Sequence, residues 1–160
     1  MEFFDVVDKD RKPLGYTKRR GLKLEENEYN VGVEIWIFND YKLLMTRRSL
    51  NKSHPGKWEV PGGCSMSGEI SIDTLKREIK EELGISINSE DCELMDTIIY
   101  KKQFVDIYIS NKIIDLNKVT LQKSEVCDIK FVTKKEFLKM AENNEIVKSV
   151  YDRFNIMFGG

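Results

Sequence analysis

Three glutamates on one predicted helical turn are the residues of this chain best suited to chemistry. Glu78, Glu81 and Glu82 follow Arg77 in the segment GCSMSGEISIDTLKREIKEELGI, which spans residues 63–85. Side chains three or four positions apart are neighbours on a helix, and like charges at that spacing destabilise it by about 0.2–0.5 kcal/mol per pair. A hard divalent cation binds carboxylate, carbonyl and water oxygens and would offset this repulsion. The spacing therefore predicts a metal site that acts on a phosphate substrate.

An apolar stripe predicts how the helix holds these glutamates. The stripe repeats at the period of a buried helix face and consists of Ile72, Leu75, Ile79 and Leu83. The glutamates lie beside it, so we expect them at the edge of the core, in a cleft. Ser71 is predicted as the N-cap, and Gly84 suits the left-handed position that ends a helix. Taken alone, the same run is also typical of a solvated charged face, and the surrounding residues decide between the two interpretations.

The whole segment resembles the Nudix box, GX5EX7REUXEEXGU, in which U is a bulky aliphatic residue. Each fixed position of the motif is matched, by Gly63, Glu69, Arg77, Glu78, Ile79, Glu81, Glu82, Gly84 and Ile85. The resemblance implies an α/β/α sandwich with a mixed β-sheet and a loop–helix–loop catalytic motif. It also implies a single domain over residues 1–160 that hydrolyses nucleoside diphosphates linked to another group X.

The family resemblance assigns metal ligands. It implies Glu78 and Glu82 as the main ligands of Mg²⁺, with Mn²⁺ as a possible substitute, and Glu81 as a further ligand or a base. The carbonyl of Gly62, just before the box, is implied to reach the same metal. The metal would neutralise phosphate charge and lower the pKa of a bound water.

The resemblance also assigns supporting and catalytic roles. Arg77 and Glu69 are expected to pair and to hold the helix and the preceding loop in register, as hydrogen bonds behind metal ligands do. A general base must take a proton from the attacking water. Glu81 is one candidate, and Glu125 is another because the base in this family often lies on a later loop.

Basic residues beside the box are candidates for binding substrate phosphates. Arg47 and Arg48 end a predicted strand, Lys52 lies in the next loop, and Lys57 begins the strand after it. Together they would form a cationic rim. Because side chains alternate along a strand, only one of the two arginines is expected to point inward. A solvated basic loop is the competing interpretation.

Composition limits the class of protein. A chain of 160 residues with 41% hydrophobic and 33% charged residues is typical of one globular domain. The net charge of −1 argues against a nucleic-acid polymer as partner. We expect a small phosphorylated substrate instead, and a nucleotide is favoured. A homodimer is left open. No apolar run reaches membrane-spanning length, and the N-terminus is not typical of a signal peptide. Three widely separated cysteines fit neither a disulfide framework nor a zinc site, which predicts a cytoplasmic protein.

Residue patterns around the box predict the remaining elements. Extended segments are expected as a hairpin at 3–7 and 14–17, as strands at 29–38, 42–47 and 57–60, as a second hairpin at 92–101 and 104–110, and as extended chain at 118–122 and 125–132. Thr133 with Glu136 forms a predicted capping box, and a final helix is expected from about 145 to 156. The aromatic residues Tyr29, Trp36, Tyr100 and Phe104 are candidates for stacking on a base, with core packing as the alternative.

Two rival functions remain at this point. The segments DVVDKDRKPLGYTKRR and HPGKWEVPGG resemble the branch of the family closest to isopentenyl-diphosphate isomerase. The position of that enzyme's catalytic cysteine is Gly62 here, Cys64 lies two residues later, and the hydrolase box is intact, so a hydrolase is favoured over an isomerase. The second rival is a non-catalytic nucleotide-binding module, which would be expected to lose box carboxylates. Neither reading identifies the substrate or the group X.

Overall fold

The computed structural model describes residues 2–159. In this range, alternating apolar residues and glycine-containing turns produce a strand-rich chain with three α-helices. The strands are β1 (Phe3–Val7), β2 (Pro13–Arg19), β3 (Asn30–Asn39), β4 (Lys42–Arg48), β5 (Trp58–Glu59), β6 (Gly62–Cys64), β7 (Glu93–Tyr100), β8 (Gln103–Ser110) and β9 (Val126–Val132). The helices are α1 (Ser71–Leu83), α2 (Lys134–Glu142) and α3 (Lys148–Phe158). In this part of the chain, no helix is long and apolar enough to cross a membrane.

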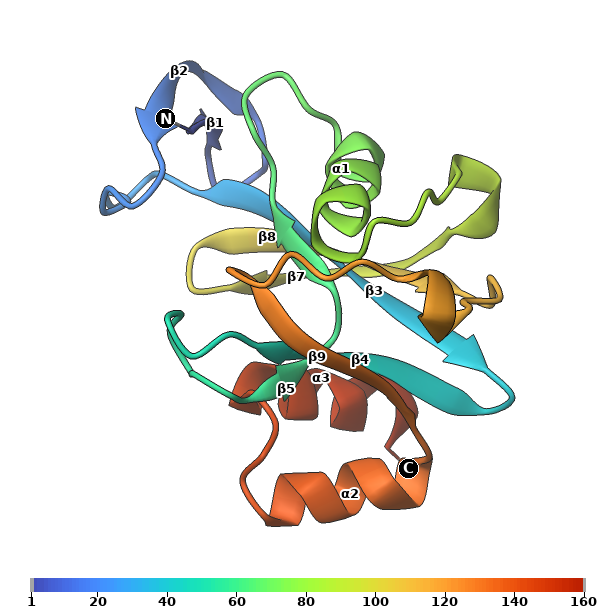
Figure 1. Ribbon diagram of the computed structural model, residues 1–160. Coiled ribbons are helices and arrows are strands. Elements are labelled where there is room, and N and C mark those ends of the chain that lie inside the picture. Colours follow the sequence, from blue (N-terminus) through green and yellow to red (C-terminus); the bar gives the residue numbers. More distant parts are fainter. Residues whose placement is uncertain (1, 160) are drawn as a thin grey trace.

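The strands and helices form an α/β/α sandwich. Strands β1 and β2 make an antiparallel hairpin, and the larger sheet has the order β5-β4-β3-β8-β7, with β6 added to β3 and β9 to β4. Strands β3 and β8 are parallel and the other pairs antiparallel, so the sheet is mixed. Helix α1 covers one face, and α2 and α3 cover the other (Figure 1). The predicted fold class is therefore confirmed.

Strand β3 supplies core residues to both layers. Its alternation sends Ile35 and Ile37 toward the buried stripe of α1, which includes Leu75, Ile79 and Leu83. Trp36 points to the other face, where it packs with Phe154 of α3. Each of these β3 side chains is fully buried, and burying such a side chain contributes about 1.5–3 kcal/mol.

The large sheet divides along one edge of β3. Residues 32–34 of β3 pair with β6, whereas the recorded register between β3 and β4 consists of Phe38 with Leu43 and Asn39 with Lys42. Strands β3 and β4 therefore stay together at the turn that joins them and diverge toward the other end. The divergence leaves room for a cleft between α1 and the β4–β5–β9 part of the sheet.

Several predicted boundaries are corrected by tertiary contacts. Ser71 is the first residue of α1 rather than its N-cap, which is Ile70, and its hydroxyl is hydrogen-bonded to the Tyr108 hydroxyl. The segment 118–122 is not a strand, because the amides of Thr120 and Gln122 donate to carbonyls at the end of α1. The final helix begins at Lys148 instead of near 145, since residues 145–147 hydrogen-bond to the backbone of Trp58. Gly84 ends α1 at φ 69°, as predicted.

Candidate functional site

Two of the predicted ligands lie side by side at the edge of the core. Glu78 and Glu82 project from adjacent turns of α1, and each is only 8% exposed. Strand β6 passes close to them, so a Cβ atom at Gly63 would lie 2.6 Å from the Glu78 carboxylate oxygen. Gly63 therefore allows the backbone of β6 to approach the carboxylate as closely as it does.

Burial makes the negative charge of these two carboxylates costly. Desolvation raises the pKa of both groups, and the pKa of Glu82 is raised further by the neighbouring Glu78 carboxylate. A divalent cation is a suitable partner for such a pair, because it prefers oxygen ligands and supplies the missing positive charge. The donor set therefore fits the metal that the family motif implies.

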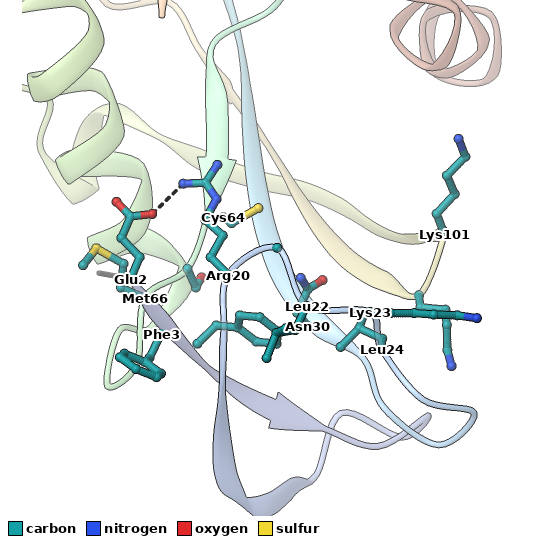
Figure 2. Close-up of a pocket in the computed structure, with 14 residues that line it drawn as sticks. Glu2, Phe3, Arg20, Leu22, Lys23, Leu24, Asn30, Cys64, Met66 and Lys101 are labelled. Carbon is teal, nitrogen blue, oxygen red and sulfur yellow. Dashed lines mark hydrogen bonds and ion pairs between the residues drawn. The ribbon is translucent and has the colours of Figure 1, made fainter. Parts of the chain in front are cut away.

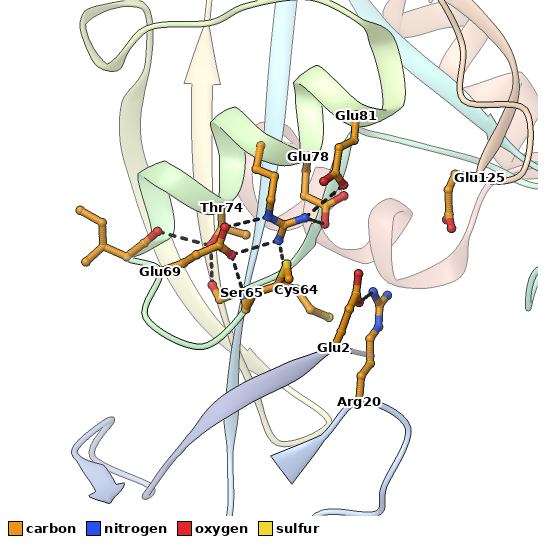
Figure 3. A network of polar contacts seen from close by, with 12 residues as sticks. Glu2, Arg20, Cys64, Ser65, Glu69, Thr74, Glu78, Glu81 and Glu125 are labelled. Carbon is orange, nitrogen blue, oxygen red and sulfur yellow. Dashed lines mark hydrogen bonds and ion pairs between the residues drawn. The ribbon is translucent and has the colours of Figure 1, made fainter. Parts of the chain in front are cut away.

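Arg77 braces the helix against the loop that precedes it, as predicted from the motif. Its Nε donates to Glu69 at 2.7 Å, and its two terminal nitrogens donate to Glu69, to Glu78 at 2.9 Å and to the carbonyl of Cys64 at 3.0 Å (Figure 3). The Met66 amide also donates to Glu69. Burial alone would raise the pKa of Glu69, but the hydrogen bonds from Arg77 and Met66 lower it below its ordinary value, so the carboxylate stays charged.

The two candidates for the general base lie on different elements that border the cleft. Glu81 is half-exposed on α1 and accepts a hydrogen bond from Arg77 at 3.2 Å. Glu125 lies on the loop before β9 and forms an ion pair with Lys52. Gly62, the predicted carbonyl ligand, lines the cleft on β6. Among residues 2–159, no group of three acidic, cysteine or histidine side chains converges as a complete metal site.

The cleft has a volume of about 620 Å³ and is lined by cationic side chains as well as by the carboxylates of α1. Arg48 and Lys52 both line it, whereas Arg47 and Lys57 do not. Arg47 donates to the carbonyl of Gly56, and Lys57 donates to the carbonyl of Asn144. One arginine of the pair at the end of β4 thus borders the cleft, as strand alternation predicts.

A second group of cleft residues was missed by sequence reasoning. Glu34 on β3 forms an ion pair with Arg153 of α3 at 2.6 Å and accepts a hydrogen bond from the Trp36 indole at 2.6 Å. Glu59 on β5 pairs with Arg48 at 3.0 Å. Burial raises the pKa of Glu59, and Arg48 opposes that rise. The one available signal was a charged residue, Glu34, in an otherwise apolar strand.

Aromatic residues divide between the core and the cleft. Trp36 and Trp58 are buried, and Phe104 is 7% exposed. Tyr29 packs against Phe104 at 5.6 Å between ring centroids. Tyr100 is 41% exposed and lines the cleft, so it is the one predicted stacking residue that borders the site.

Comparison with known proteins agrees with this fold and this site. The sequence profile of the NUDIX domain matches residues 28–154. An uncharacterized Nudix hydrolase of Listeria monocytogenes is 33% identical over 150 residues, which cover 92% of this chain and 89% of the relative. The chain therefore belongs to the Nudix family, within the class of Nudix pyrophosphohydrolases.

Two further relatives extend the comparison. The crystal structure of DR0079 from Deinococcus radiodurans has a TM-score of 0.76 and 21% identity, and the match covers 91% of this chain and 92% of that one, which supports the fold. An isopentenyl-diphosphate Delta-isomerase of Mycolicibacterium vanbaalenii is 26% identical over 115 residues, 70% of this chain and 63% of the relative. The similarity to the isomerase branch is therefore present but weaker than the similarity to the hydrolases.

Proposed function

We propose that this protein hydrolyses a pyrophosphate bond in a nucleotide or nucleoside diphosphate derivative, with Mg²⁺ or Mn²⁺ as cofactor. The observation that carries the proposal is the burial of Glu78 and Glu82 on adjacent turns of α1, with Gly63 close to Glu78. Two carboxylates that repel each other in a buried place are costly without a cation. The Nudix box, whose carboxylates the family resemblance assigns to a divalent metal, includes both residues and lies within the matched domain.

In this proposal α1 and β6 hold the cation. Glu78 and Glu82 would be its carboxylate ligands, and Gly62 would contribute its carbonyl. When bound, the cation neutralises phosphate charge and acidifies a water molecule. Arg77 and Glu69 keep the Glu78 side chain in place, because the guanidinium bonds both carboxylates and the Cys64 carbonyl at once.

The chain's own residues supply proton transfer and charge. Either Glu81 or Glu125 accepts the proton of the attacking water, since both carboxylates border the cleft. Arg48, Lys52 and Arg153 also border it, and they would attract the phosphate oxygens. Phosphate binding would compete with the ion pairs that Arg48 and Lys52 form with glutamates.

Hydrolysis of a panel of nucleotide derivatives to a nucleoside monophosphate, phosphate or pyrophosphate tests the proposal, with Mg²⁺ and Mn²⁺ compared. We expect metal-dependent turnover that Glu82→Gln abolishes. Glu81→Gln and Glu125→Gln identify the base, because loss of the base lowers kcat by about 10²–10⁴-fold whereas loss of a supporting ion pair has a smaller effect. Conversion of isopentenyl diphosphate without hydrolysis of any nucleotide would show that the protein is an isomerase instead.

We further propose one Nudix domain in the cytoplasm. The family profile covers residues 28–154, and the N-terminal hairpin packs onto the same sheet through the Arg11–Asp106 ion pair. Cys64, Cys92 and Cys127 are all free thiols, which suits a reducing compartment.

A further inference from the structure

A second cavity lies beside the cleft, between the N-terminal hairpin and strand β6. It has a volume of about 430 Å³, within the range typical of small-molecule sites. Its walls include the side chains of Phe3, Phe4, Leu22, Leu24 and Met66 (Figure 2). The apolar character contrasts with the cleft, where carboxylates and cations dominate. The two spaces therefore suit chemically different parts of one molecule.

The cavity and the cleft share a wall. Glu2, Arg20 and Cys64 border both spaces. An ion pair of 2.6 Å joins Arg20 to Glu2 at this boundary (Figures 2 and 3). Arg20 lines the cleft together with Glu78 and Glu82, the predicted metal ligands. A molecule that spans the boundary would present its phosphates to both Arg20 and the cleft.

Asn30 gives the apolar cavity a polar group. Its carboxamide oxygen is buried, and no hydrogen-bond partner for it exists among the residues that the structure describes. Rotation of the amide toward the cavity would therefore break no hydrogen bond of that oxygen. A purely aliphatic ligand would leave the oxygen unpaired, and an unpaired buried acceptor is unfavourable. A flat ring that carries an N–H group would instead stack on the apolar walls and donate to Asn30.

We propose that this cavity binds the nucleobase of the substrate, with Asn30 accepting a hydrogen bond from a base N–H group and Arg20 contacting the phosphate chain at the boundary. The inference rests on the proposed function, since it assigns the nucleoside side of the substrate in the same reaction. It makes the β1–β2 hairpin, which lies before the matched family profile, a part of the substrate site.

Calorimetric titration of the metal-free protein tests this proposal without relying on turnover. The probes are the four ribonucleoside monophosphates, with ribose 5-phosphate as the probe that lacks a base. We expect at least one nucleotide to bind ten-fold more tightly than ribose 5-phosphate. Asn30→Leu should reduce that preference about ten-fold, and Met66→Trp, which fills the cavity, should abolish it.

Asn155→Leu is the matched control, because Asn155 is exposed on α3 away from the cavity. It should leave the preference unchanged, and thermal unfolding of each variant shows that it is folded. Equal affinity for the nucleotides and ribose 5-phosphate in the wild type would overturn the proposal. So would tighter binding of a branched alkenyl phosphate than of any nucleotide, or an unchanged preference in folded Asn30→Leu and Met66→Trp. Failure of the hydrolase proposal is separate, since it appears as the absence of hydrolysis of any nucleotide derivative by the wild-type protein.

Discussion

Replacing Glu82 by glutamine should stabilise the metal-free protein while abolishing its activity. Burial and the Glu78 carboxylate raise the pKa of Glu82 above the ordinary value of 4.5. A group whose pKa is raised by folding favours the folded state fully below its unfolded pKa, and this contribution is lost as the pH rises through the folded pKa. Glutamine removes the charge and can donate its amide hydrogen to Glu78. The stability difference should therefore be small near pH 4.5 and grow toward alkaline pH.

The size of the effect follows from the burial of the carboxylate. Glu82 is 8% exposed, and an uncompensated buried polar or charged group costs about 1–3 kcal/mol or more. For a chain of this length, 1 kcal/mol corresponds to about 2–4 °C in Tm. We therefore expect Glu82→Gln to raise the Tm by about 2–12 °C in a chelator at alkaline pH.

Thermal unfolding in EDTA, followed by circular dichroism across a pH series, measures this difference. Added Mg²⁺ should raise the Tm of the wild type more than that of Glu82→Gln, because only an intact site gains binding energy in the folded state. Glu90→Gln is the control, since Glu90 is exposed and lies outside the cleft. A Glu82→Gln protein less stable than wild type at alkaline pH without metal would refute the reasoning.

Three other substitutions probe the contacts of Arg77 with Glu69 and Glu78, the close approach of β6 to Glu78, and the N-terminal hairpin. Arg77→Lys should lower kcat/KM about 10–100-fold with the fold retained, because lysine cannot make the forked contacts of the guanidinium; a rate equal to wild type would contradict this role. Gly63→Ala should weaken Mg²⁺ binding in a titration, since the added methyl group collides with Glu78, and unchanged affinity would argue against a ligand there. Glu28→Gln should destabilise the protein at neutral pH. Hydrogen bonds to Glu28, of which the one from Lys18 has the largest effect, lower the pKa of this carboxyl group to about 2. That stabilisation is present above pH 4.5 and is lost as the pH falls toward 2, so the unfolding curves of wild type and variant should converge in acid.

Local patterns predicted the elements whose determinants are close in sequence. The apolar stripe of α1, Gly84 at its end, and the Thr133 capping box all depend on residues within a few positions of one another, and the structure confirms each. Ser71 is not the N-cap that its residue type predicts, and its hydroxyl is hydrogen-bonded to a distant residue, Tyr108. A local rule for caps does not include such a contact.

Residues from distant segments complete the cleft, and sequence spacing did not reveal them. Arg153 reaches Glu34 across 119 positions only because α3 packs on the face of β3 that carries Glu34 and Trp36. Glu59 was unremarkable in sequence, and its burial depends on how β5 pairs with β4. The candidate carboxylate ligands lie on one helix, so their spacing could be recognised in the sequence, whereas the other residues that border the cleft come from several elements.

The divergence of β3 from β4 places the candidate metal ligands and the cations of the cleft on two separate parts of the fold. Glu78 and Glu82 line the cleft from α1, while Arg48 and Lys52 line it from the end of β4 and its following loop. The recorded pairing between β3 and β4 lies at their shared turn, far along the strands from Arg48. A small change in the angle between the strands would therefore alter the distance between cations and carboxylates without disturbing either set. Substitutions near Phe38 and Leu43 would therefore change the distance across the cleft between the cations and the carboxylates. Their effects on KM should differ in sign between substrates with long and with short phosphate chains.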